Sequence, residues 1–335
     1  MDEFMNWNID EIKNIPPYTE MKLDCFQNLL ITILIHYGLN VDYFGATWPW
    51  LFEIDYINEE AVIVNKVICN DERIKTLYNI ALAKKDFSED IISDIRRIVD
   101  EMPIIINLDQ YYVPHPHIFN KQHGRHSLLL LSDDQEQGVF CLDTMPEYKG
   151  FIDRESLVIG IKSFPYKFGY SKYCWLESER INYNVDQESL FMYFTQLLNA
   201  TYIINDLPSH KLDLGLKNIL NTVKEMNEGS EAELSESINK LFQGTWTWEI
   251  DRSPNWLIRY LKTDFITKKL GSDSIEKVTE RIAAVSNMVA LSFRVLYKYL
   301  ISKKINDFTK GKELLINAQK EENELLQFLL SVTKS

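Results

Sequence analysis

The stretch that decides the fold is GRHSLLLLSDDQEQGVFCLDT, residues 124–144. Two apolar runs, residues 127–131 and 139–142, flank the polar segment 132–138, which ends at a glycine. Apolar runs on either side of a short polar segment that contains glycine are typical of a β-hairpin. The sequence therefore predicts two adjacent antiparallel strands, with His126 opening the first and Asp143 ending the second.

The register of this hairpin decides whether His126 and Asp143 meet. If Ser132 pairs with Val139, then Leu128 pairs with Asp143. His126 then lies diagonally to Asp143 on the same face, and a register that differs by two residues places the two directly opposite each other. Either arrangement puts the carboxylate within reach of the imidazole, whereas a slip of one residue would put them on opposite faces. The hairpin can thus deliver a histidine base together with a carboxylate that orients it.

The rest of the chain divides into a mixed part and a helical part. Before the hairpin, the pattern predicts helices at residues 23–37, 71–84 and 88–101 and strands at residues 62–68 and 104–108. Helices followed by antiparallel hairpins indicate the α+β class. Further along, amphipathic helices are predicted at residues 187–199, 214–226, 231–242, 274–302 and 311–332. We therefore predict a catalytic domain at residues 1–178 and a mostly α-helical domain or lid at residues 179–335.

Composition excludes several classes of protein. The net charge of −13 argues against a nucleic-acid binder and mildly favours cationic partners. Neither GxGxxG nor GxxxxGK[ST] occurs, so a kinase, nucleotidase or dehydrogenase has no support and no cofactor is expected. The first residues, MDEFMNWNID, lack a signal-peptide pattern, and the longest apolar stretch, residues 29–35, is too short to span a bilayer. A cytoplasmic protein without a membrane partner is expected.

Cys25 is the candidate nucleophile. The 4 cysteines form neither a CxxC pair nor a zinc-like spacing, so all are expected to be free thiols. Cys25 lies in the first turn of a predicted helix, where unpaired N–H groups and the helix dipole favour the thiolate. A backbone N–H at this position can also donate to a developing oxyanion. The alternative interpretation is a cysteine that is simply buried in a helix.

Cys25, His126 and Asp143 together match the roles of a nucleophilic triad. Cys25 would attack a carbonyl or thioester, and His126 would accept the thiol proton and later deprotonate the second nucleophile. Asp143 would hold the imidazole in one tautomer and stabilise its charged form. The sequence thus indicates acyl-transfer chemistry through a covalent intermediate on sulfur.

The order of these residues along the chain is similar to that of the papain-like fold. Four short segments resemble the butirosin biosynthesis protein H family of acyltransferases. They are LDCFQ at residues 23–27, DQYYVP at 109–114, GRHS at 124–127 and LD at 142–143. The resemblance covers roughly residues 15–150. It departs at Thr19, where papain-like peptidases carry a glutamine that donates to the oxyanion, so the second oxyanion donor stays unassigned.

The resemblance implies an amide-forming transferase of antibiotic biosynthesis, as in nonribosomal peptide pathways. The acyl group would come as a thioester on the phosphopantetheine of an acyl or peptidyl carrier protein. The acceptor would be a small amine or diamine, as in a relative of this kind that forms the amide bonds of closthioamide. Two alternatives stay open, namely a cysteine peptidase or amidase that uses water, and a non-catalytic scaffold with a papain-like core. A homo-oligomer is also left open.

The segment at residues 109–124 leads directly into His126 and is rich in proline and histidine. Asp109, Tyr111 and Tyr112 are therefore expected to line the substrate cleft. The chain also concentrates histidines here, at His115, His117, His123 and His126. Their spacing differs from the paired spacing of most zinc sites, so the sequence predicts a polar loop and no metal centre.

Overall fold

The protein is described by a computed structural model that divides the chain into two compact units. It describes residues 14, 16–19, 23–47, 52–57, 60–65, 71–114, 121, 123–164, 173–177, 181–206, 216–226, 230–241 and 252–334. The first unit contains Met1–Val41 and Cys69–Val185, and the second contains Asp42–Ile68 and Asp186–Ser335. The boundary predicted at residues 178–179 lies a few residues before the observed one. The segment Asp42–Ile68, which falls within the predicted first domain, belongs to the second unit.

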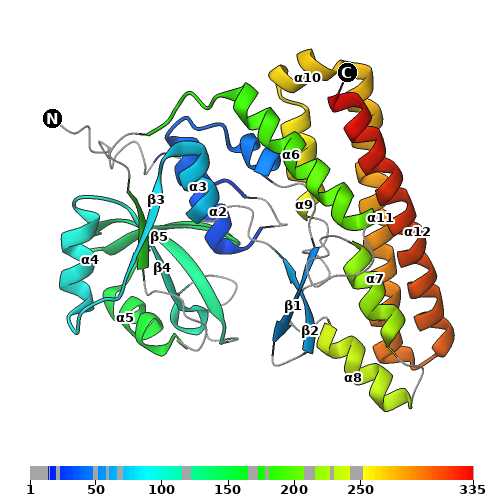
Figure 1. Ribbon diagram of the computed structural model, residues 1–335. Helices are drawn as coiled ribbons and strands as arrows, with labels where there is room; N and C mark the ends of the chain where they lie inside the picture. The colour runs from blue at the N-terminus through cyan, green and yellow to red at the C-terminus, as the bar shows by residue number, and fades with distance from the viewer. Residues whose placement is uncertain are drawn as a thin grey trace. The chain divides into compact units, whose positions relative to one another are not determined.

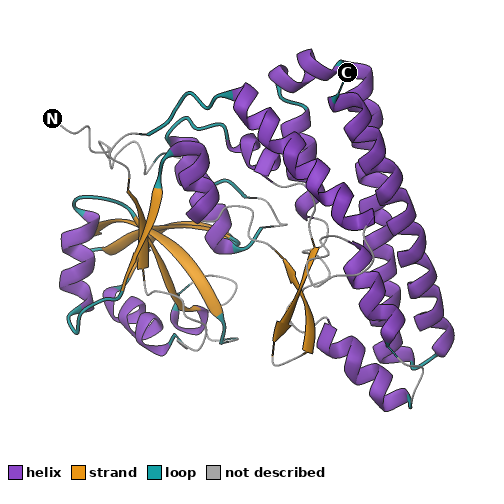
Figure 2. Ribbon diagram, in the orientation of Figure 1, coloured by secondary structure: helices purple, strands orange, loops and turns teal. Residues whose placement is uncertain are grey.

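A six-stranded antiparallel sheet, in the order β3-β8-β4-β5-β6-β7, is the centre of the first unit (Figures 1 and 2). Its strands are β3 (Ala81–Lys85), β4 (Ile104–Asp109), β5 (Arg125–Asp134), β6 (Gly138–Thr144), β7 (Glu147–Ile152) and β8 (Tyr173–Glu177). The predicted α+β class is confirmed, and so is the hairpin, which forms β5 and β6. This hairpin lies inside the sheet, with β4 on one side and β7 on the other.

Helices pack around this sheet (Figure 1). They are α2 (Cys25–His36), α3 (Asp71–Tyr78), α4 (Ile91–Val99), α5 (Arg154–Ser163) and the short 3₁₀ helix η2 (Gln110–Tyr112). The helix predicted at residues 71–84 is too long. Asn79 has a positive φ of 57°, which ends the helix, and the following residues form β3, which pairs with β8. Pairing with a neighbouring strand here outweighs the helical propensity of the sequence ALAKK.

The core of the first unit explains the long apolar runs. β4 is buried at each of its positions, so both of its faces are covered. Ile106 and Leu108 of β4 and Leu128 of β5 share one cluster with apolar residues of α4 and α5, including Ile95 and Ile161. Burial of this kind contributes about 25 cal/mol for each Å² of apolar surface removed from water. The sheet is therefore a rigid support for the side chains at its ends.

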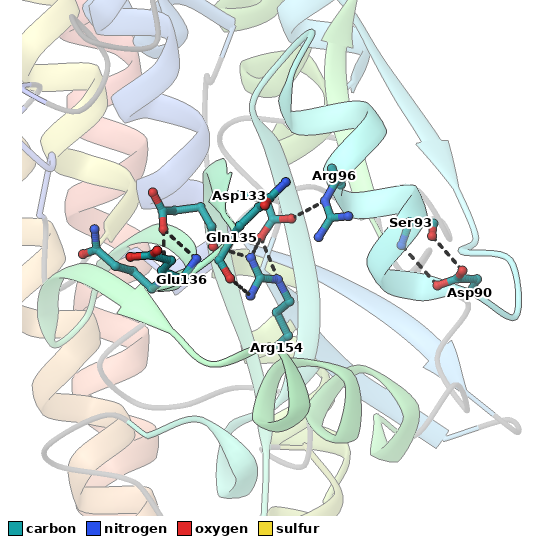
Figure 3. Close-up of polar contacts among 9 residues, drawn as sticks. Asp90, Ser93, Arg96, Asp133, Gln135, Glu136 and Arg154 are labelled. Atoms are coloured by element: carbon teal, nitrogen blue, oxygen red, sulfur yellow. Dashed lines mark hydrogen bonds and ion pairs between the residues drawn. The ribbon is translucent and has the colours of Figure 1, made fainter.

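A buried carboxylate fixes α4 and α5 to the tip of the β5–β6 hairpin (Figure 3). The Asp133 side chain is only 1% exposed. It accepts from Arg96 Nε of α4 at 2.8 Å and from Arg154 Nε of α5 at 2.9 Å. Arg154 also donates to the backbone carbonyls of Asp134 and Gln135. Because one buried carboxylate accepts from an arginine of each helix, Asp133 helps to determine where both helices dock.

The second unit is mainly helical. Its first part contains the 3₁₀ helix η1 (Val41–Thr47), whose first residue still belongs to the first unit, and the antiparallel strands β1 (Phe52–Ile57) and β2 (Glu60–Asn65). Its second part contains the helices α6 (Gln187–Asp206), α7 (Leu216–Glu225), α8 (Glu231–Leu241), α9 (Arg252–Leu261), α10 (Asp264–Leu270), α11 (Ser272–Ser302) and α12 (Ile305–Thr333). The five helices predicted after residue 186 are confirmed. α11 and α12 lie side by side (Figure 1). Within the described residues, no helix has the length and apolar character to cross a membrane.

Contacts with α9 explain why the segment after Val41 belongs to the second unit. Arg259 Nε donates to Asp42 Oδ1 at 2.6 Å. Gly45 lies so close to the backbone of Trp256 that an added Cβ would be 2.0 Å from its carbonyl oxygen. Phe44 packs edge-on against the same tryptophan. Only glycine fits this approach, and the sequence pattern alone does not reveal such a distant partner.

Candidate active site

A β-bulge in the β5–β6 hairpin sets the register that brings His126 and Asp143 together. Ser132 pairs with Phe140 rather than with Val139, the first pairing considered above. A β-bulge after Leu130 then shifts the ladder by one residue, and Leu129 pairs with Leu142. This is the register that we expected next to the site. A bulge inserts one extra residue on one strand, which shifts the pairing beyond it by one residue.

His126 and Asp143 consequently face each other. His126 Nε2 and Asp143 Oδ2 are 2.5 Å apart, and both residues are buried. The backbone N–H of Met145 donates to the other carboxylate oxygen, Oδ1, at 3.0 Å. Because each oxygen has a partner, the carboxylate is fixed in orientation and holds the imidazole in turn.

Cys25 lies close to this histidine. It is the first residue of α2, whose N-cap Asp24 accepts from the backbone N–H of Gln27 at 2.7 Å. Cys25 is half-buried, and it lies close enough to His126 to help raise the pKa of the imidazole. Since Asp143 occupies Nε2, the other ring nitrogen, Nδ1, is left for the sulfur. The structure thus places Cys25, at the N-terminus of α2, near the hydrogen-bonded pair of His126 and Asp143.

Two tethers, which the sequence analysis missed, join the segment around Cys25 to the end of β6. Thr19 Oγ1 donates to the carbonyl of Thr144 at 3.1 Å. The amide of the buried Asn28 donates to Leu23 O at 3.3 Å and lies 3.6 Å from Met145 Sδ. Asn28 immediately precedes the apolar run 29–31. A polar residue next to such a run is a sequence signal for a buried amide with a structural role. The hydroxyl of Thr19 is engaged in its tether, so it is not positioned as an oxyanion donor.

The surroundings of His126 favour its charged form. Burial lowers the pKa of the imidazole, but hydrogen bonds to Asp143 and Cys25 and their charges outweigh it and raise the pKa from 6.5 to about 10. His126 is therefore protonated at neutral pH. Because the folded pKa is raised, this interaction stabilises the fold fully below pH 6.5, and the stabilisation is lost as the pH rises through about 10.

Asp109 closes the loop that precedes β5. Its Oδ1 accepts from the backbone N–H groups of Tyr111 and Gly124, each at 3.1 Å, and its Oδ2 lies 2.8 Å from His123 Nδ1. Burial raises the pKa of this carboxyl, but these hydrogen bonds outweigh burial and lower the pKa overall. Tyr111 stacks on the ring of His123, and Tyr112 packs edge-on against both rings. The three residues predicted to line a cleft thus form one cluster around His123.

The remaining histidines of the loop, His115 and His117, lie outside the described residues, as does Cys69. The other cysteines, Cys25, Cys141 and Cys174, are free thiols, as predicted. In the parts of the chain that the structure describes, no three His, Cys, Asp or Glu side chains gather as a metal site would require.

The sequence was compared with protein-family models and with curated proteins. No protein-family model matches the sequence, and no curated protein is significantly similar to it. The functional argument therefore rests on the chemistry of the site.

Proposed function

We propose that the chain is a papain-like thiol acyltransferase, similar to the butirosin biosynthesis protein H family, which forms an amide through an acyl-enzyme on Cys25. The observation that supports the proposal is the hydrogen bond between His126 and Asp143, together with the proximity of Cys25, at the start of α2, to His126. A nucleophile, a base and a residue that orients the base are the parts that acyl transfer through sulfur needs.

Acylation uses the charge pair of Cys25 and His126. The thiolate attacks the carbonyl carbon of an acyl thioester, and the electron pair of the C=O bond moves onto oxygen. The backbone N–H of Cys25 belongs to the first turn of α2, where N–H groups have no partner within the helix. This N–H can donate to the oxyanion. The oxyanion then re-forms the C=O bond and the bond to the departing sulfur breaks. His126 gives its proton to the departing thiolate, and the acyl group stays on Cys25.

Deacylation transfers the acyl group to an amine. The nitrogen attacks the Cys25 thioester carbonyl, and His126, now neutral, removes a proton from that nitrogen. The C–S bond breaks, the amide departs, and the thiolate and imidazolium are restored. Asp143 keeps the proton of His126 on Nε2 throughout, so that Nδ1 faces the reacting atoms.

Chemistry and charge favour a carrier-bound thioester as donor and an amine as acceptor. Exchange between a thioester and a thiol needs little driving force, so phosphopantetheine on an acyl or peptidyl carrier protein is a suitable donor. The net charge of −13 suits a cationic amine or diamine. The same three residues would also serve a cysteine peptidase or amidase, which uses water as the acceptor. The non-enzymatic alternative is a scaffold protein whose site is inert.

The fate of the acyl-enzyme separates these functions. We expect wild type, loaded from the acetyl thioester of N-acetylcysteamine, to lose its acetyl group at least about tenfold faster with added ethylamine than in buffer alone, because an amine bound at the site has a high effective concentration. Intact-mass spectrometry over time, with detection of N-ethylacetamide, measures this partition. Equal discharge with and without amine would favour a hydrolase, and the absence of an adduct, also with carrier-bound donors, would favour the scaffold.

A further inference from the structure

A buried asparagine follows the candidate nucleophile by one turn of α2. Asp24 is the N-cap of this helix and Cys25 is its first residue. Leu23 therefore lies just before the cap, and Asn28 lies at the fourth helical position. Apolar side chains at these two positions often pack together and fix the angle at which the chain enters a helix. Here the fourth position holds an amide instead, and Asn28 is 0% exposed.

The amide of Asn28 connects the chain that enters α2 with the chain that leaves β6. Its Nδ2 donates to the carbonyl of Leu23 at 3.3 Å and lies 3.6 Å from Met145 Sδ. Cys25 follows Leu23 by two residues. The backbone N–H of Met145 donates to Asp143 Oδ1 at 3.0 Å. One buried side chain thus contacts both the segment that leads to the nucleophile and the residue that holds the carboxylate.

A second connection runs parallel to this amide, through residues 18 and 19. The buried Thr32 Oγ1 of α2 donates to the carbonyl of Asn28 at 2.8 Å and accepts from the backbone N–H of Tyr18 at 2.9 Å. The next residue, Thr19, donates its hydroxyl to the carbonyl of Thr144 at 3.1 Å. The helix that carries Cys25 is therefore joined twice to the end of the strand that carries the carboxylate.

We propose that Asn28 and Thr19 are positioning residues, which align Cys25 with the histidine–carboxylate pair of the candidate active site. This inference rests on the proposed function and deepens it. Without the two connections, the start of α2 is no longer fixed to the end of β6, and the sulfur of Cys25 is displaced from the imidazole. A misplacement of about 1 Å costs about 10²-fold in rate, so the alignment matters more for the reaction than for the fold.

Asn28→Leu tests this role, because leucine has the same branched shape without the polar atoms. We expect acetylation by saturating acetyl-N-acetylcysteamine to slow about 10²-fold. The thioester concentration that gives half of the maximal rate should not change, since the buried Asn28 touches no substrate. Cys25 is one cause of the raised pKa of His126, so displacement of the sulfur should also lower that pKa, which ¹⁵N NMR of the imidazole measures. A loss of stability alone would leave this titration unchanged in the folded protein.

Thr19→Val is the milder second variant. Thr19 is exposed, and valine keeps its branched shape while removing the hydroxyl, so the fold is retained. We expect acetylation to slow about 2–10-fold, the equilibrium factor that one hydrogen bond contributes. Ser292→Ala is the matched control for Asn28→Leu. Ser292 is equally buried and donates to the carbonyl of Gly311 at 2.8 Å, but this bond joins α11 to α12 in the second unit. The control should change neither the rate nor the His126 titration.

Circular dichroism shows which variants are folded. A folded Asn28→Leu or Thr19→Val protein that is acetylated at the wild-type rate overturns the proposal, and Thr19→Val decides alone if Asn28→Leu does not fold. The proposal is equally overturned if Asn28→Leu slows acetylation without a change in the His126 titration, or if Ser292→Ala slows it by the same factor. Failure of the proposed function is distinguishable, because wild type would then form no acetyl-enzyme while the His126 titration would still report the alignment.

Discussion

Cys25→Ala is expected to lower the rate of amide formation by about 10⁵-fold or more, since removal of a catalytic nucleophile abolishes the covalent route. The alanine cannot form the acyl-enzyme, and it also removes the sulfur that pairs with His126. The residual amide formation in this variant comes from direct attack of free amine on a thioester that is bound to the protein but not transferred to it. The measurement is the initial rate of amide formation from a carrier-bound or N-acetylcysteamine thioester, with circular dichroism to confirm folding.

Cys174→Ala is the matched control for this result. Cys174 is a buried residue of β8, and burial raises the pKa of its thiol to about 12. It is therefore a thiol at neutral pH and is not nucleophilic. We expect this variant to keep the wild-type rate. If Cys25→Ala retained a tenth or more of the activity, Cys25 would not be the nucleophile.

Asp143→Asn is expected to reduce the rate by about 10²–10⁴-fold while preserving the fold, as loss of the orienting carboxylate does in triads. Asp143 accepts at both oxygens, from His126 and from the backbone N–H of Met145. An asparagine offers one acceptor and one donor. If its oxygen faces Met145, its NH₂ meets His126 Nε2 and forces the proton onto Nδ1, where the base must act. If it is turned round, its NH₂ meets the Met145 N–H.

The same variant has a spectroscopic readout that a merely structural role would not produce. In wild type we expect the His126 ring to stay protonated at neutral pH and to titrate near pH 10. Because the hydrogen bond and charge of Asp143 are two of the causes of the raised pKa, Asp143→Asn should lower it, which ¹⁵N NMR of the imidazole measures. Asp90→Asn, which retains a good N-cap on α4, should change neither the rate nor the titration. An unchanged His126 titration in Asp143→Asn would contradict this role of Asp143.

The local sequence pattern predicts the β5–β6 hairpin but not its bulge. The apolar runs predicted both strands, and with them the neighbourhood of His126 and Asp143. The bulge after Leu130 has no local signature, because each residue of that run is leucine. β7 was not predicted at all. Its sequence, EYKGFI, is mixed in polarity because it is an edge strand with mostly exposed or half-buried positions.

Long-range contacts account for the parts of the site that the sequence could not show. Cys25, His126 and Asp143 can be recognised from the sequence because they are reactive residue types that lie near the ends of predicted helices and strands. The bond of Thr19 to Thr144 spans 125 residues and that of Asn28 to Met145 spans 117. Such pairs follow from packing rather than from periodicity. The same reason explains the segment Asp42–Ile68, whose partners lie far along the chain.

The most direct test is to locate the acyl group on the wild-type protein. The protein is mixed briefly with acetyl-N-acetylcysteamine, quenched in acid, digested and mapped by tandem mass spectrometry. The account predicts one acetyl group, on the peptide that contains Cys25, and its loss when Cys25 is first alkylated with iodoacetamide. An acetyl group on another residue, or none with either this thioester or a carrier-bound donor, would contradict the acyl-enzyme.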